Sequence, residues 1–537
     1  MLRSLQERRE AVVNELRAIK VSKEAGLIGG QSLGEALTAV VNLRRRGGVT
    51  AGVINSGRRF GDRTAIIDEL GGVAYGDLDR RTNAIAHRWH ELGLRAGDGV
   101  AVLARNHRGL PYAVYAAGKL GCRILLLNTD FAGPQVRAVI EREGVDLLVA
   151  DEEYVAQLDG VAPRFGVFRA WADSPGEDTL EALATGGDTE LPPVPAQHAK
   201  IVVLTSGTTG TPKGAPRSEV RGLTAVAAML ERIPFRSGGV TEMCAPMFHS
   251  LGFGYMLLMS GLGSTIVLRR RFDPVATLDS IERHRSTGMV LVPVMLQRMV
   301  SLGPDAFDSR DLSSLTAVLV SGSQLGSALA TRALELFGPV VHNLYGSTEV
   351  AYATIATPGD LVEHPTTVGK VCLGARLRIL DEQGREVPTG ATGRVFVRNA
   401  IPFDGYTGGG HKEVIDGLMS SGDLGHLDAD GRLFIDGRDD EMLVSGGENL
   451  FPREVEETLE HHPDVGDVAC VGVPDDSFGE RLRAFVVRRT GSTVTEDELR
   501  AYVKENLAGF KVPREVVFLD ELPRTATGKV LKRELRG

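Results

Sequence analysis

Residues 200–214 read KIVVLTSGTTGTPKG, an apolar run followed by a loop of glycines, small hydroxyl residues and one lysine. The run KIVVL is typical of a buried parallel β-strand, and ligands gather at the carboxyl ends of such strands in open α/β sheets. Glycine backbone N–H groups, hydroxyl donors and the charge of Lys213 together suit a polyphosphate. The loop lacks the GK[ST] ending of a Walker loop, and from composition alone a plain surface turn fits equally well.

The same alternation of apolar runs and helical patterns extends over residues 60–350. Runs rich in Val, Ile and Leu occupy residues 99–106, 122–129, 145–151, 288–293 and 317–322. Between them lie helical patterns, such as the one at 81–94. Near-continuous apolar strands separated by helices indicate parallel sheets covered on both faces, so the fold class is α/β.

The length of 537 residues predicts several domains, because a single core stops growing at roughly 250–300 residues. After Gly393 the sequence becomes β-rich, and a short αβ unit begins at about residue 440. We therefore predict an N-terminal extension over 1–50 and a large domain of layered, mostly parallel sheets with helices and a β-rich subdomain over 51–439. A small, mobile α+β domain is expected over 440–537.

The first 50 residues are basic, with nine Lys or Arg against five Glu. Apolar side chains at near-helical spacing predict an amphipathic helix there; they are Leu2, Leu5, Val12, Leu16 and Ile19. Two interpretations remain open for this stripe. It packs on the protein's own domain, or it contacts an anionic membrane surface.

Composition excludes several classes of protein. A net charge of −9 argues against binding to nucleic acid, which is itself negatively charged. A composition of 42% hydrophobic and 24% charged residues is typical of a soluble globular protein. The four cysteines are far apart and form no CxxC pair, which predicts reduced core residues. Neither a signal-peptide core nor a run of about 18 apolar residues occurs, so we expect a cytoplasmic protein and leave a homodimer open.

Residues 205–214 resemble the phosphate-binding signature of the adenylate-forming superfamily, which includes acyl-CoA synthetases, adenylation domains and beetle luciferases. Three further motifs of that superfamily follow in the same order and with similar separations. They are YGSTE at 345–349, the stretch from SGDLG to REVE at 421–456, and PRTATGKVLKREL at 523–535. The resemblance covers about residue 50 to the C-terminus, and four motifs in register make a chance match untenable.

The resemblance implies a two-step reaction that uses ATP, Mg²⁺ and CoA. A carboxylate attacks the α-phosphate of ATP to give an acyl-adenylate and pyrophosphate, and a thiol then attacks the activated carbonyl. The β- and γ-phosphates would be held by Thr205, Ser206, Gly207, Thr208, Thr209, Gly210 and Lys213. Mg²⁺ would be held by Glu349. The rest of the nucleotide would contact Gly322, Ser323, Asn343, Tyr345, Gly346, Ser347, Thr348, Asp423, Ile435 and Arg438.

Within that set, Tyr345 resembles the aromatic residue against adenine, Thr348 the contact to the α-phosphate, and Asp423 with Arg438 the ribose contacts. The wording SGSQ around Gly322 and Ser323 departs from the more common pattern of the family.

The small domain contributes its own assignments by resemblance. Asp440 lies at the hinge between the two domains, and Gly446 and Gly447 line the pantetheine channel in the second step. Lys529 reaches into the site for adenylation, where an ammonium group meets the carboxylate and the α-phosphate. His249 is either a gate at the acid pocket or a satisfied structural histidine.

The acid is expected to be apolar, because SLGFGYMLLMSGLG at 250–263 contains no Asp or Glu to pair with a substrate ammonium. A medium- or long-chain fatty acid is the preferred substrate, and an aryl or branched acid is the alternative. No carrier-protein segment follows Lys529, which favours a CoA ligase. A stand-alone enzyme that loads a carrier protein and a non-catalytic nucleotide-binding homologue are the other hypotheses.

Overall fold

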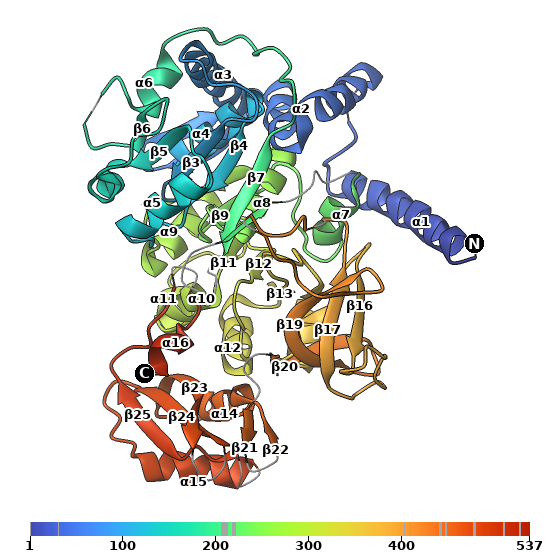
Figure 1. The fold of residues 1–537 in the computed structure, drawn as a ribbon, viewed down its shortest axis with the longest axis vertical. Coiled ribbons are helices and arrows are strands. Elements are labelled where there is room, and N and C mark those ends of the chain that lie inside the picture. Colours follow the sequence, from blue (N-terminus) through green and yellow to red (C-terminus); the bar gives the residue numbers. More distant parts are fainter. Residues whose placement is uncertain are drawn as a thin grey trace.

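The computed structural model describes residues 2–30, 32–174, 176–205, 213–216, 222–401, 403–407, 409–439, 443–445, 448–475, 479–507, 511–525 and 528–536. These residues form three sheets with helices around them (Figure 1). Two sheets belong to the large N-terminal part of the chain, and the third belongs to the small α+β unit at its C-terminal end.

The largest sheet is parallel in one half and antiparallel in the other. Its parallel half has the order β1 (Thr64–Asp68), β10 (Thr265–Val267), β9 (Val240–Met243), β11 (Gly288–Leu291), β12 (Ala317–Val320) and β13 (Val341–Tyr345), with β2 (Gly71–Ala74) antiparallel at the edge. Beyond β13 it continues antiparallel through β14 (Thr354–Ala356), β15 (Gly369–Val371), β20 (Arg432–Arg438), β19 (Leu418–Leu427), β17 (Gly393–Arg398) and β16 (Arg376–Leu380), and β18 (Val414–Ile415) pairs with β19. The β-rich part thus begins before Gly393. The sequence placed its start too late because β14 and β15 are too short to show a pattern.

The second sheet contains the predicted strand at residues 200–205, which precedes the glycine-rich loop. Its parallel strands follow the order β6 (Val167–Trp171), β5 (Leu147–Asp151), β3 (Gly99–Leu103), β4 (Arg123–Leu126) and β7 (Lys200–Thr205), with β8 (Lys213–Pro216) antiparallel to β7. All five apolar runs predicted as parallel strands are confirmed, as β3, β4, β5, β11 and β12.

Helices separate and cover the two large sheets. The main core lies between the sheets and includes α3 (Tyr75–Glu91), α4 (Gly109–Lys119) and α8 (Ser250–Gly261). The outer face of the second sheet packs on α5 (Gly133–Arg142) and the 3₁₀ helix η1 (Glu152–Leu158). The outer face of the largest sheet packs on α9 (Pro274–His284), α10 (Pro293–Val300), α11 (Pro304–Asp308), α12 (Ser327–Phe337) and α13 (Pro358–Glu363). Two shorter helices join the main core, α6 (Leu180–Thr185) and α7 (Thr224–Leu230).

The C-terminal unit is a separate sheet with its own core (red in Figure 1). Its strands are β22 (Glu448–Leu450), β21 (Leu443–Ser445), β24 (Gly479–Arg488), β23 (Val465–Asp475) and β25 (Glu515–Leu519). The core is closed by α14 (Pro452–Glu460) and α15 (Glu496–Asn506), and α16 (Lys532–Leu535) packs on a second small cluster. Of the four cysteines, Cys122, Cys372 and Cys470 are buried, Cys244 is half-buried, and all are free thiols as expected.

The chain begins with two long helices, α1 (Leu2–Glu24) and α2 (Leu33–Arg59). The interpretation that this helix packs on its own domain is confirmed, but the face is not the predicted stripe, since Val12, Leu16 and Ile19 are 60%, 63% and 44% exposed. The helix packs on α7 through another face, on which Ala18, Val21 and Ser22 are buried. Among the described residues, no helix is both long and apolar enough to cross a membrane.

Candidate active site

A cavity of about 2210 Å³ runs through the large domain and reaches the C-terminal unit. Thirteen of the residues predicted from the sequence line it: His249, Gly322, Ser323, Asn343, Tyr345, Gly346, Ser347, Thr348, Glu349, Asp423, Ile435, Arg438 and Lys529. They come from sequence positions nearly 300 residues apart, and the strand order brings them together. Thr205 and Lys213 pair in backbone register between β7 and β8, at the edge of the second sheet. The remaining predicted residues lie outside the described part of the chain: Ser206, Gly207, Thr208, Thr209, Gly210, Asp440, Gly446 and Gly447.

The turn after β13 holds Glu349 in a fixed orientation. Gly346 is required there, since a Cβ at this position would lie 2.2 Å from the carbonyl oxygen of Ala351. The hydroxyl of Ser347 accepts hydrogen bonds from the backbone N–H groups of Glu349 and Val350, each at 3.2 Å. The same hydroxyl donates to Oε2 of Glu349 at 2.9 Å, so one serine shapes the turn and orients the carboxylate.

Glu349 is held as an anion. Burial raises its pKa, but hydrogen bonds from Tyr406, Ser347 and its own backbone N–H, together with the charge of Lys412, outweigh burial and lower the pKa below the usual value. The Tyr406 hydroxyl donates to Oε1 at 2.6 Å. The described residues contain no group of three or more His, Cys, Asp or Glu side chains that could hold a metal ion. A single ionised carboxylate nevertheless fits Mg²⁺, which takes one or two protein carboxylates and completes its coordination with phosphate oxygens and water.

A second carboxylate, Asp423, lies at the junction of β19 and β20. Sheet register pairs Asp423 with Arg438, whose guanidinium donates to Oδ1 at 3.1 Å. The hydroxyl of Tyr345 donates to Oδ2. Burial, and then the charge of Asp423, raise the pKa of Tyr345 well above its usual value, so the phenol keeps its proton. A carboxylate fixed in this way suits a pair of ribose hydroxyls.

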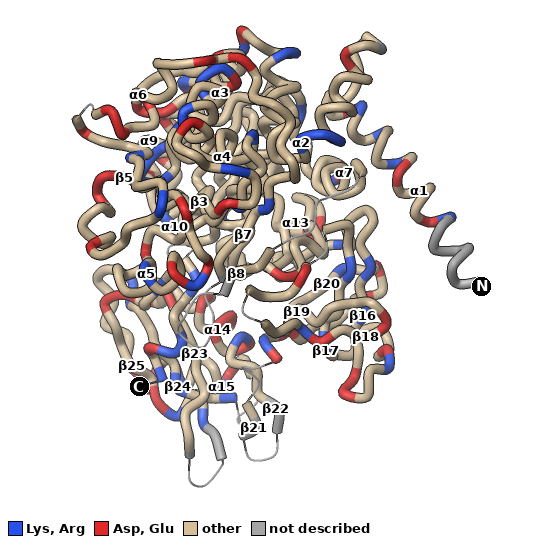
Figure 2. Tube along the Cα trace, turned by 45° about the horizontal axis from the view of Figure 1, so that its top comes forward, with Lys and Arg blue, Asp and Glu red and all other residues tan. Residues whose placement is uncertain are grey.

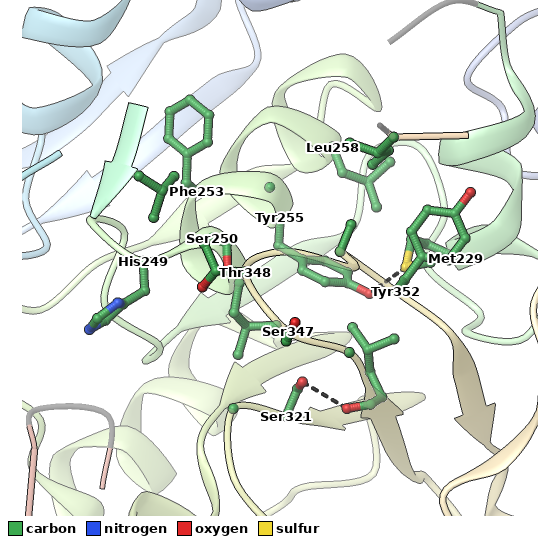
Figure 3. Close-up of a pocket in the computed structure, with 18 of the residues that line it drawn as sticks. Met229, His249, Ser250, Phe253, Tyr255, Leu258, Ser321, Ser347, Thr348 and Tyr352 are labelled. Carbon is green, nitrogen blue, oxygen red and sulfur yellow. Dashed lines mark hydrogen bonds between the residues drawn. The ribbon is translucent and has the colours of Figure 1, made fainter. Parts of the chain in front are cut away.

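The strand ends of β12 and β13 form the neighbouring wall. Gly322 adopts a φ of 99°, a conformation that favours glycine, and follows Ser321, whose hydroxyl donates to the carbonyl oxygen of Leu344 at 2.7 Å. Figure 3 shows this bond below Ser347 and Thr348. Asn343 lies one strand position before Leu344 on β13, between β12 and β14.

Lys529 reaches the cavity from the C-terminal unit on a braced loop. The backbone N–H of Thr525 donates to the carbonyl oxygen of Lys529 at 2.8 Å, and the N–H of Lys529 donates to the Thr525 hydroxyl at 3.1 Å. Arg524 pairs with Asp467 at 2.6 Å and donates to the carbonyl oxygen of Gly528 at 2.5 Å. The loop lies against the large domain, since a Cβ on Gly528 would be 2.3 Å from Cγ1 of Val294 on α10.

Two further contacts join the C-terminal unit to the wall beside Gly322. The amide of Gln324 donates to Oε1 of Glu457 at 3.2 Å, and the Ser327 hydroxyl lies 3.2 Å from Nε2 of His461. These contacts and the packing of Gly528 act together, so the unit is docked with Lys529 facing the same cavity as Glu349.

His249 immediately precedes α8 and lines the same cavity (Figure 3). Its Nε2 atom is buried and finds no hydrogen-bond partner among the described residues, which does not favour a satisfied structural histidine. Burial lowers the pKa of His249 to about 4, so the ring is neutral at pH 7.

Beyond His249 the cavity becomes apolar. Its walls are α8, α7 and α2, with side chains that include Leu223, Val226, Met229, Leu251, Phe253, Tyr255, Leu257 and Leu258. Figure 3 shows the Tyr255 hydroxyl directed at Met229, to whose sulfur it donates at 3.3 Å. None of the described lining residues of these three helices is Asp or Glu. The cavity therefore joins a polar end to a long apolar branch.

Sequence reasoning missed four side chains that shape the polar end: Ser321, Tyr406, Lys412 and Ser421. Ser421 accepts a hydrogen bond from the backbone N–H of Asp423 at 3.1 Å, and Tyr406 and Lys412 act on Glu349. Tyr406 and Lys412 flank the glycine cluster at 408–410, which was the one sequence signal that could have drawn attention to them.

Comparison with known proteins identifies the family. The family model of the AMP-binding enzymes matches residues 54–407, and the model of the AMP-binding enzyme C-terminal domain matches residues 454–529. The chain belongs to the AMP-binding enzyme family. More particularly, it falls in the acyl-CoA synthetase branch of the adenylate-forming superfamily and is an enzyme of the AMP-forming acid–thiol ligase kind.

Three relatives show the range of that branch. The indoleacetate–CoA ligase of Aromatoleum aromaticum is 32% identical over 88% of this chain and 94% of its own length. Feruloyl-CoA synthase from an Amycolatopsis species is 33% identical over 87% and 94%. The fatty acid–[acyl-carrier-protein] ligase ScoC of Streptomyces coeruleorubidus is 30% identical over 88% and 92%. Among solved structures, ATP-bound MatB from Rhodopseudomonas palustris aligns with a TM-score of 0.81 at 26% identity, over 90% of this chain and 97% of MatB.

Proposed function

We propose that this enzyme activates a medium- or long-chain fatty acid as acyl-AMP and transfers the acyl group to CoA, with ATP and Mg²⁺ in the first step. One observation carries the proposal. The cavity joins a polar end, with Glu349, Asp423 and Lys529, to an apolar branch whose described lining on α2, α7 and α8 has no acidic side chain. An unbranched hydrocarbon fits such a branch, whereas a substrate ammonium would find no partner there.

The first step needs charge stabilisation and positioning, not a protein nucleophile. A carboxylate oxygen of the acid attacks the α-phosphorus of ATP, the bond to the β-phosphate breaks, and pyrophosphate leaves. Lys529 would meet the incoming carboxylate and the α-phosphate oxygens with its ammonium. Asp423 and Arg438 would hold the ribose, with Tyr345 against adenine. Glu349 would ligate Mg²⁺, which when bound neutralises charge on the phosphates.

The second step transfers the acyl group. The CoA thiol, as its sulfur loses a proton, attacks the acyl carbonyl and AMP leaves. We propose that the loop from Thr205 to Lys213 holds the β- and γ-phosphates in the first step. We propose too that Asp440 is the hinge between a large domain over 51–439 and a small one over 440–537, and that Gly446 and Gly447 line the thiol channel in the second step. These roles rest on the resemblance of the motifs.

Two alternatives have support of their own. The indoleacetate and feruloyl ligases favour an aryl acid, and ScoC favours a carrier protein in place of CoA. We prefer the fatty acid because apolar side chains from three helices, α2, α7 and α8, line the branch, more than a single aromatic ring would contact.

Mass spectrometry of products tests the proposal directly. Purified protein is incubated with ATP, Mg²⁺, CoA and a pool of fatty, aryl and branched acids. We expect acyl-CoA products that peak at one fatty chain length. Acyl-adenylates without thioesters would move the acceptor to a carrier protein, and a single aryl-CoA product would contradict the fatty acid.

Gly254 offers a matched test of where the hydrocarbon lies. It lines the cavity on α8, and a Cβ there meets nothing within 4 Å, so a larger side chain fits without strain. We expect Gly254→Leu to shift the product peak to shorter acids. Gly359→Leu, at an exposed position on α13 outside the cavity, is the control and should leave the peak unchanged. An identical chain-length profile for all three proteins would show that the acid does not enter the branch.

A further inference from the structure

Exposed apolar side chains concentrate on the two N-terminal helices. Of the fifteen large apolar residues that are exposed in the described chain, eight lie within residues 12–43. Four are on α1: Val12, Val13, Leu16 and Ile19. Four are on the first half of α2: Leu37, Val40, Val41 and Leu43. Scattered apolar side chains need no explanation, but a cluster of this kind marks an interaction site.

A sharp kink divides α2 beside this cluster. Gly47 has a φ of 77°, which breaks the helix into two halves. The halves fold toward each other, since the amide of Asn42 donates to Oδ1 of Asn55 at 2.7 Å. The first half is fixed to the domain by Arg46, which donates to the carbonyl oxygen of Pro192 at 2.8 Å.

The apolar branch of the cavity opens at this kink. Its lining includes Ala39, Val40 and Leu43 from the first half of α2, Val49 and Gly52 from the second half, and Leu27 from the preceding connection. Val40 and Leu43, which line the cavity, are 47% and 42% exposed and so belong to the exposed apolar cluster as well. The branch therefore reaches the surface directly beneath the exposed apolar cluster.

The charges around the cluster are complementary to an anionic surface. Arg9, Lys20, Lys23, Arg44 and Arg45 are all exposed. Two of the acidic residues of α1 are engaged elsewhere in the protein: Glu10 pairs with Arg376, and Glu15 accepts a hydrogen bond from Thr224 at 2.8 Å. Figure 2 shows α1 along the flank of the molecule.

We propose that α1 and the first half of α2 dock on an anionic lipid bilayer, and that the hydrocarbon chain of the acid passes from the bilayer through the kink of α2 into the cavity. The proposal rests on the proposed fatty-acid function for the identity of the acid. Apolar side chains flanked by Lys and Arg are the composition that binds a membrane interface without spanning it. On this path the carboxylate enters first and stops at the nucleotide end, and the hydrocarbon chain trails behind it toward the kink.

Vesicle flotation tests the docking surface. The full chain is mixed with phosphatidylcholine vesicles with or without 30% phosphatidylglycerol, a composition chosen for the assay, and compared with Leu16→Asp/Leu37→Asp. Leu16 and Leu37 are exposed and lie outside the cavity lining, so the variant should fold and act normally on a short soluble acid. Val362→Asp, at a 64% exposed site on α13, is the matched control.

We expect the wild type and the control to float with the anionic vesicles, and the double variant to lose at least about tenfold in binding. The double variant should also turn over a vesicle-embedded long-chain acid more slowly. Equal flotation of all three proteins, or none for the wild type, would overturn the docking surface. A concentration-dependent dimer in sedimentation that the double variant abolishes would assign the cluster to a second copy of the chain instead.

Leu43→Trp tests the passage separately, because Leu43 lines it. We expect a higher KM for long-chain acids from vesicles, with flotation unchanged and the KM for a short soluble acid unchanged. An unchanged long-chain KM would overturn the passage. If no acid is adenylated while anionic vesicles still bind the protein, the proposed function fails and the docking surface stands, so the two failures are distinguishable.

Discussion

The close contact between Gly528 and Val294 allows the position of Lys529 to be perturbed by a substitution at Gly528. Gly528 has a φ of 78°, and a Cβ there would lie 2.3 Å from Cγ1 and 2.7 Å from Cβ of Val294. Gly528→Ala therefore has two costs when the C-terminal unit is docked. An L-residue in the left-handed region costs about 1–2 kcal/mol, and overpacking against a helix costs about 1–3 kcal/mol.

Together these costs disfavour the docked arrangement by about 2–5 kcal/mol, and each 1.4 kcal/mol is about a tenfold change in population. We expect adenylation, measured as acid-dependent pyrophosphate release, to fall by at least about tenfold. Thioester formation from supplied acyl-AMP and CoA should fall much less, because Lys529 is not assigned to that step.

The double variant Gly528→Ala/Val294→Gly separates the two costs. It removes both atoms that the new methyl group would meet, so it should recover the overpacking part of the loss and keep the part due to φ. Adenylation within about threefold of wild type in Gly528→Ala would refute the reasoning. Equal loss in both half-reactions, with an unchanged free energy of unfolding, would refute it as well.

Three other substitutions give independent checks. Lys529→Ala should cut pyrophosphate release by about a hundredfold or more and leave ATP affinity within severalfold, and near-normal release would contradict its assignment. Tyr406→Phe removes a donor to Glu349 and should raise the pKa of that carboxyl, so activity should be lost at a higher pH on the acid side; an unchanged acid limb would count against Glu349 as the metal ligand. Burial raises the pKa of Glu242 to about 7, although hydrogen bonds from Ser286 and Ser280 act to lower it. Between pH 4.5, the ordinary pKa of a glutamate, and pH 7, the folded protein therefore keeps a proton on Glu242 that the unfolded chain has released. The free energy of unfolding should fall by about 3 kcal/mol as pH rises from 4.5 to 7, and denaturant unfolding of Glu242→Gln should lack that slope.

Much of the parallel architecture could be predicted from the sequence, because buried strands such as β3 and β12 are continuous apolar runs and their periodicity is local. The antiparallel half was harder to predict, since three-residue strands such as β14 and β15 carry no pattern and form only when β13 and β20 flank them. The apolar stripe of α1 misled the prediction of packing for a related reason. Period alone identifies an amphipathic helix but not which face meets the domain, and Ala18 permits a closer approach to α7 than Leu16 would.

For the site, the sequence by itself supplied the candidate groups: the motifs that resemble those of the adenylate-forming superfamily predict Glu349, Asp423 and Lys529. Only the tertiary structure decided how they are held. Tyr406 meets Glu349 across 57 residues and Tyr345 meets Asp423 across 78, contacts that depend on sheet order and that no local pattern encodes. The kink at Gly47 likewise joins the apolar branch to the surface only through the folding of α2 against the domain, because a cavity is a property of packed elements and not of any one of them.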